Sequence, residues 1–150
     1  MKFAQNIMNT IKRLTDDDII GKKIVRVYEK QLDKIGRFQP RLTIVCLNSN
    51  TLFMLDQFHD AEKDAILDLW SCDYEESFVP ILDLEKEPNL DSPIKAIIFR
   101  ERLDVSANNT AILLENEFIL TIRIGEFDMG HKFFKPSPEF RNGIPLKIAH

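Results

Sequence analysis

The chain has 150 residues, of which 44% are hydrophobic and 29% charged, and its formal net charge at pH 7 is −4. This length predicts a single domain that buries its core without metals or disulfides. No apolar run approaches the roughly 18 residues of a membrane span, so no membrane association is expected. The polar N-terminus does not resemble a signal peptide, and Cys46 and Cys72 lack metal-binding spacing. We therefore expect a cytoplasmic protein with two free thiols.

Apolar side chains recur at helical spacing near the N-terminus: Phe3, Ile7, Met8, Ile11 and Leu14. This spacing predicts an amphipathic helix over residues 2–14 that docks on the protein's own sheet, with a partner-binding or membrane-surface helix as the alternative. Thr15 followed by Asp18 resembles a capping box, which predicts one further helical turn ending at Gly21.

The first half then predicts three strands, Lys22–Ile35, Arg41–Leu47 and Thr51–Phe58. The turn residues Asn48–Asn50 separate the last two, because asparagine tolerates left-handed backbone conformations. The strand Arg41–Leu47 is apolar on both sides, which is typical of a strand covered on both faces of a sheet.

The second half repeats this order, with strands predicted at Ile94–Asp104, Thr110–Glu115 and Phe118–Ile124. The last strand alternates strictly, which predicts one face buried and one face in solvent. Asn48 and Asn116 hold equivalent places in the two halves. The shared order fits an internal duplication of a three-stranded meander, although two unrelated meanders would look similar.

Between the halves, Asp60–Trp70 fits either a short helix or a strand from Ala65 onward, and Leu82–Pro93 reads as a loop. Glycines and prolines predict an irregular C-terminal tail with one short strand at Leu146–Ile148.

The predicted fold class is therefore α+β, with an N-terminal helix and a mostly antiparallel sheet or half-open barrel of about six to eight strands. A single domain is expected to contain a helical segment at 1–20, meanders at 22–58 and 94–124, an acidic linker at 59–93 and a tail at 125–150.

Residues that could carry catalysis are sparse. His59 lies near Asp56 and Asp60, and such a set can bind Zn, Mn or Fe, but no second histidine stands at ligand spacing. Neither cysteine has a nearby histidine that would activate it. The sequence therefore predicts no catalytic residues, no metal and no cofactor. A metal-assisted hydrolase that uses Asp56, His59 and Asp60 is the least favoured hypothesis.

The charge is unevenly distributed. Residues 56–91 contain twelve acidic and two basic residues, a net charge of −10, so the rest of the chain sums to +6. Aromatic residues interrupt this acidic stretch, which combines charge for steering with aromatic side chains for anchoring. The predicted partner-binding residues are Asp60, Asp64, Asp68, Trp70, Asp73, Tyr74, Glu75, Glu76 and Phe78. The alternative is a solvated acidic face with its aromatic side chains turned inward.

These features favour a non-enzymatic protein that inhibits a basic protein partner, such as an immunity protein (an antitoxin) that neutralises a nuclease-type toxin domain. A homodimeric structural module with a solvated acidic face is the alternative. Nucleic-acid binding is not favoured, because the basic residues of the first half are spread over strand ends and a loop.

Overall fold

The computed structural model describes residues 11–37, 41–55, 66–67, 69–99, 110–121, 134–136, 144–145 and 147–148. Within these ranges there is one α-helical turn, α2 (Asp16–Ile19), and one 3₁₀ turn, η1 (Pro88–Leu90). The strands are β1 (Ile24–Gln31), β2 (Arg41–Leu47), β3 (Leu52–Leu55), β4 (Ile66–Leu67), β5 (Val79–Asp83), β6 (Ile94–Phe99), β7 (Thr110–Leu114), β8 (Phe118–Thr121), β9 (Phe134–Pro136), β10 (Ile144–Pro145) and β11 (Lys147–Ile148).

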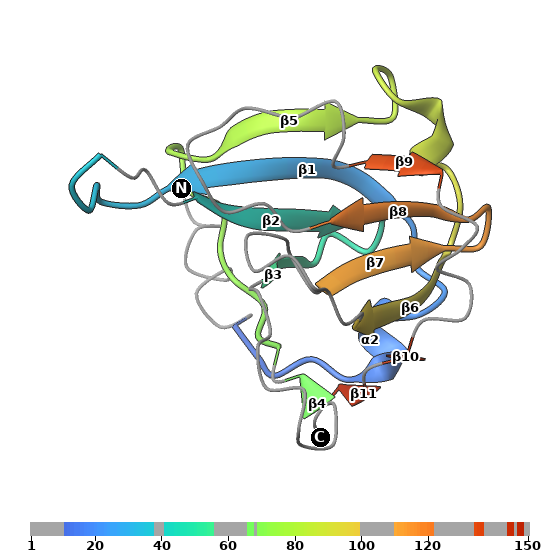
Figure 1. The fold of residues 1–150 in the computed structure, drawn as a ribbon. Helices are drawn as coiled ribbons and strands as arrows, with labels where there is room; N and C mark the ends of the chain where they lie inside the picture. The colour runs from blue at the N-terminus through green and yellow to red at the C-terminus, as the bar shows by residue number, and fades with distance from the viewer. Residues whose placement is uncertain are drawn as a thin grey trace, which may run out of the picture.

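The strands form two antiparallel sheets and one small parallel pair (Figure 1). The first sheet has the order β3-β2-β1-β5, and the second sheet has the order β10-β6-β7-β8-β9. β4 and β11 pair in parallel and lie at the bottom of the view. The predicted, mostly antiparallel architecture is confirmed. Both three-stranded meanders are present. β5 extends the first meander at one edge, and β10 and β9 extend the second meander at both edges.

The predicted strands are found. β1 is shorter than the predicted Lys22–Ile35, and β7 ends at Leu114, one residue before the predicted end. The last residues predicted for β3, β6 and β8 lie outside the described ranges. β2 has the predicted bounds Arg41–Leu47. Its core-facing side chains Val45 and Leu47 are buried, whereas Leu42 and Cys46 on its other face are only half-buried, so the prediction that both faces are covered holds in part.

β5 lies within the segment expected to be an acidic linker, and β9 and β10 lie within the expected irregular tail. These strands are short, so the partner strand determines them rather than any local pattern. Ile66–Leu67 adopts the strand alternative, and β11 falls inside the expected terminal strand.

The prediction of a helix over residues 2–14 is wrong for its last part, while residues 1–10 lie outside the described ranges. Arg13 forms a β-bridge with Trp70, and the Leu14 N–H donates to the Leu69 carbonyl at 2.9 Å. The Leu14 side chain is fully buried. Pairing with a distant segment therefore replaces the helical hydrogen bonds that apolar spacing alone had indicated.

The capping prediction at α2 is confirmed. Asp18 Oδ2 accepts a hydrogen bond from the Thr15 N–H at 2.8 Å, and this bond holds the pKa of Asp18 below its usual value. The turn ends where Gly21 adopts φ +85°, a conformation that glycine reaches without strain. The Gly21 N–H donates to the Ile94 carbonyl, so this turn helps to connect the two sheets.

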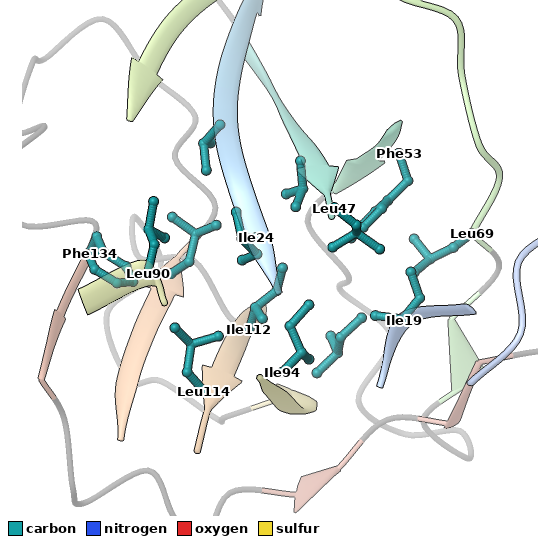
Figure 2. Close-up of a cluster of buried hydrophobic side chains, with 14 of the residues drawn as sticks. Ile19, Ile24, Leu47, Phe53, Leu69, Leu90, Ile94, Ile112, Leu114 and Phe134 are labelled. Carbon is teal, nitrogen blue, oxygen red and sulfur yellow. The ribbon is translucent and has the colours of Figure 1, made fainter. Parts of the chain in front are cut away.

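One hydrophobic core lies between the two sheets (Figure 2). The first sheet contributes Ile24, Val27, Val45, Leu47 and Phe53, and the second sheet contributes Ile94, Ile97, Ile112, Leu114, Leu120 and Phe134. We call the face that each sheet turns toward this core its inner face, and the opposite face its outer face.

The outer face of the second sheet is also buried. Ile98, Ala111, Leu113 and Ile119 form a separate aliphatic cluster in which no side chain is more than 2% exposed. The prediction that Phe118–Ile124 is half-buried is therefore wrong for β8, because Ile119 and Leu120 are both fully buried. Alternation in the sequence showed two rows of side chains but did not show that both rows are covered.

Candidate functional site

The outer face of the first sheet carries an apolar cluster that is only partly covered. Tyr28 on β1 lies opposite Ile44 on β2, which in turn lies opposite Met54 on β3, so their side chains share this face. Tyr28, Ile44 and Phe78 are buried there. The half-buried side chains packed against them are Leu42, Cys46, Leu52, Met54 and Cys72. The face therefore leaves apolar surface in contact with solvent.

Residues 69–78, which we call the aromatic segment, extend the first sheet beyond β3. The Cys72 N–H donates to the Leu52 carbonyl at 2.8 Å. On its other side, the Ser71 N–H donates to the Lys12 carbonyl at 2.9 Å, and Ser71 Oγ accepts from the Lys12 N–H at 2.8 Å. The segment thus lies between residues 12–14 and β3, with its backbone bonded on both sides.

This pairing determines the direction of Trp70. Its neighbours Leu69 and Ser71 are both buried, so the alternation of extended backbone turns Trp70 to the outer side. The indole side chain is 51% exposed. The exposed indole leaves a large apolar area in contact with solvent.

Tyr74 is the second exposed aromatic residue of the segment, and two buried rings support it. Its ring centroid lies 5.7 Å from that of Tyr28 and 5.6 Å from that of Phe78, both in edge-to-face geometry. Tyr28 and Phe78 are themselves 5.9 Å apart. Phe78 is only 3% exposed, whereas Tyr74 is 55% exposed. The packing orients the Tyr74 ring while leaving more than half of the side chain accessible.

An ion pair holds the same segment against β1. Lys30 Nζ lies 3.0 Å from Glu75 Oε1 and 3.1 Å from Glu75 Oε2. In addition, the Phe78 N–H donates a hydrogen bond to the Glu75 carbonyl at 3.0 Å, which forms a turn. Because Glu75 is paired, its charge is partly neutralised within the protein.

The structure separates the predicted partner-binding residues into groups. Asp60, Asp64 and Asp68 lie outside the described residues. Trp70, Tyr74, Glu75 and Glu76 are exposed, and Asp73 is half-buried. Phe78 is buried in the protein's own outer-face cluster.

Sequence reasoning missed the β1 and β3 side chains that share this surface, above all Tyr28, Leu52 and Met54. Their alternation along the two strands was the signal that could have identified them.

Other carboxylates of the acidic stretch also have partners in the protein. Asp91 forms an ion pair with Lys23 at 3.1 Å, and Asp83 Oδ1 accepts from the Lys86 N–H at 2.8 Å. Among the described residues, Glu76 is an exposed carboxylate without an ion-pair partner. The acidic character close to Tyr74 is therefore weaker than the net charge of the stretch suggests.

The two thiols are poor nucleophiles. Burial raises the pKa of Cys46, and burial together with the nearby Asp73 and Glu75 carboxylates raises the pKa of Cys72 to about 11. Both thiols are therefore protonated near neutral pH. Cys72 lines an open cleft of about 420 Å³ whose other walls are mostly hydroxyl, amide and ammonium side chains: Lys12, Ser49, Asn50, Thr51, Leu52 and Ser71.

No cluster of three or more His, Cys, Asp or Glu side chains suited to a metal ion occurs in the described part of the chain. His59, with Asp56 and Asp60, lies outside that part. Likewise, none of the helices in the described ranges is long and apolar enough to cross a lipid bilayer.

Comparison with family models, with curated proteins and with solved structures gives no match to this chain.

Proposed function

We propose that this protein is a non-enzymatic binding protein whose outer first-sheet face contacts a basic protein partner through Trp70 and Tyr74. The observation that carries the proposal is the exposure of these two aromatic side chains, 51% and 55%, from one extended segment. Aromatic anchors of this kind provide a large share of binding free energy when a partner buries them.

The support beneath Tyr74 favours binding. A ring already packed against Tyr28 and Phe78 loses little conformational freedom when a partner covers it. The half-buried Leu52 and Met54 belong to the same face and extend the apolar area. This arrangement resembles the apolar centre of an interface surrounded by polar groups.

The acidic residues supply the preference for a basic partner. Glu76 and Asp73 flank Tyr74 in sequence, and carboxylates at the rim of an interface increase the rate of association with a cationic surface. Inhibition of a nuclease-type toxin by an immunity protein is the specific form of this proposal. In that form, carboxylates of the segment would occupy the cationic cleft that otherwise binds phosphates.

Affinity capture from the source organism's lysate, with quantitative mass spectrometry, tests the proposal. The tagged wild-type protein should retain a basic protein. The substitution Tyr74→Ala should weaken binding at least tenfold, as for an aromatic hot spot of about 2 kcal/mol. Leu84→Ala serves as the control, because Leu84 is an exposed apolar residue outside the aromatic segment. Equal retention by wild type and Tyr74→Ala would remove the proposal.

Sedimentation velocity distinguishes the homodimer alternative from binding to a basic partner. A dimer of the purified protein that dissociates on Tyr74→Ala substitution would assign the same face to self-association instead of to a basic partner.

A further inference from the structure

The cleft of about 420 Å³ lies between the turn that precedes β3 and the start of the aromatic segment, and we call it the polar cleft. The turn and β3 line it with Ser49, Asn50, Thr51 and Leu52, and the aromatic segment and its neighbour line it with Ser71, Cys72 and Lys12. Sites that bind small molecules in proteins measure roughly 300–1,000 Å³, so the polar cleft has room for one such molecule.

Backbone hydrogen bonds fix the lining of the polar cleft. The turn is closed at 2.9 Å from the Asn50 N–H to the Leu47 carbonyl, and at 2.9 Å from the Leu47 N–H to the Thr51 carbonyl. The aromatic segment is joined to β3 at this level by the bond from the Cys72 N–H to the Leu52 carbonyl at 2.8 Å. Because the backbone is held on both sides, a ligand would lose little affinity to the ordering of its site.

The lining predicts a polar ligand. Pockets for apolar molecules are lined mainly by hydrophobic and aromatic side chains, whereas most of the described lining here carries hydroxyl or amide groups. Ser49 Oγ donates to Thr51 Oγ1 at 3.2 Å. A hydroxyl has one donor and two lone pairs, so this bond leaves donor and acceptor capacity on the pair, and the Asn50 amide supplies both as well. The polar cleft therefore suits a molecule whose neighbouring groups both donate and accept hydrogen bonds.

The charge around the polar cleft favours an uncharged ligand. Among the described lining residues Lys12 is the one charged side chain, and its Nζ lies 3.4 Å from Asp18 Oδ1, which weakens its attraction for an anion. Burial, and then the carboxylates of Asp73 and Glu75, raise the pKa of Cys72 to about 11, so negative potential reaches the polar cleft and opposes an anion further. A cation would in turn be repelled by the Lys12 ammonium.

We propose that the polar cleft binds an uncharged polyhydroxylated molecule, namely a sugar of one or two rings. Hydroxyl groups of the sugar would bond to Ser49, Asn50 and Thr51, and a C–H face of the ring would pack on Leu52. This site rests on the turn and its hydroxyl groups and not on the exposure of Trp70, so it goes beyond the proposed binding function and does not depend on it.

Titration of ¹⁵N-labelled protein with D-glucose, D-galactose, D-mannose, N-acetyl-D-glucosamine and maltose tests the proposal. At least one of these sugars should shift the backbone amide resonances of Asn50, Thr51 and Cys72, with half-saturation at about 1–30 mM. The amide of the core residue Ile112 should not move. Shifts that do not saturate with any of the sugars up to about 200 mM would overturn the proposal. Saturation by inorganic phosphate at constant ionic strength, but by no sugar, would overturn the assignment of an uncharged ligand.

Two variants locate the site. Thr51→Val removes the hydroxyl at nearly constant shape, and Asn50→Gly removes the amide from a residue whose φ of 66° glycine adopts without strain. Each should weaken sugar binding at least threefold, as expected for the loss of one hydrogen bond. Ser77→Ala is the matched control, because it removes an exposed hydroxyl that bonds to Glu75 outside the polar cleft, and it should leave the affinity unchanged.

Unchanged affinity in both Thr51→Val and Asn50→Gly would overturn the assigned location. The wild-type titration decides whether a sugar binds even where a variant fails to fold.

Discussion

The two meanders of this protein share their local geometry. β1 and β6 each begin with a β-bulge, between Ile24 and Arg26 in one case and between Ile94 and Ala96 in the other. The tight turn that follows the second strand of each meander contains a residue at positive φ, 66° at Asn50 and 72° at Glu117. Both turns close with the same hydrogen bond, from Asn50 to Leu47 and from Glu117 to Leu114.

The starts of the two meanders also pair with each other. Lys23 and Pro93 form an antiparallel bridge, the Asn48 N–H donates to the Lys23 carbonyl, and the Glu115 N–H donates to the Pro93 carbonyl. This reciprocal arrangement supports the hypothesis of an internal duplication. It also corrects the predicted equivalence: Asn48 corresponds to Glu115, one residue before Asn116.

The outer faces are where the two meanders differ. In the second sheet, the face is aliphatic and buried. In the first sheet, the face carries aromatic residues and thiols and is only half-covered. The two meanders therefore share a backbone arrangement, but the outer face is buried in the second sheet and accessible to solvent in the first. This difference, more than the acidic composition, directs the functional proposal to the first sheet.

The largest effect should come from truncating one apolar side chain on each outer face and comparing the loss of stability. Ile119→Ala should lower the free energy of unfolding by about 2–5 kcal/mol, because Ile119 is fully buried and the substitution leaves a cavity. Met54→Ala, on the half-covered face, should lower it by about 1 kcal/mol. Denaturant unfolding with an unchanged m-value measures both. Equal losses would show that the two outer faces are covered to the same degree.

A smaller effect is expected at the two equivalent turns. Glu117→Gly should raise the free energy of unfolding by about 0.5–1 kcal/mol, because glycine reaches positive φ without the clash that a Cβ imposes. Asn50→Gly should change it by less, since asparagine already tolerates this conformation. Thermal unfolding of the two single variants gives the comparison. Destabilisation by Glu117→Gly would show that the glutamate side chain stabilises its turn more than the strained backbone weakens it.

These turns also illustrate what the sequence could predict. The turn at Asn48–Asn50 and the capping pair Thr15 and Asp18 depend on local interactions, and both predictions were correct in type and position. The strands of both meanders were recognisable because their apolar rows are long. β5, β9 and the extended residues 11–14 could not be recognised, because their structure depends on a partner strand far away in sequence.

The candidate site was predicted only in part for the same reason. Composition identified Trp70, Tyr74 and Phe78 together, but only the three-dimensional packing shows that Phe78 is buried while Tyr74, on the same Tyr28 ring, is exposed.

The smallest effect concerns the ion pair that holds the aromatic segment on β1. Lys30→Met should lower the free energy of unfolding by about 0.5 kcal/mol, because Lys30 and Glu75 are both partly exposed and water screens their attraction. In about 1 M salt the difference from wild type should vanish. Lys86→Met is the control, since among the described residues the Lys86 ammonium forms no ion pair and only its backbone N–H bonds to Asp83. A loss above about 1.5 kcal/mol would mean that charge, rather than the ring cluster of Tyr28, Tyr74 and Phe78, holds this segment on the sheet. The outer face of the first sheet would then open in high salt, and binding through Tyr74 would weaken with it.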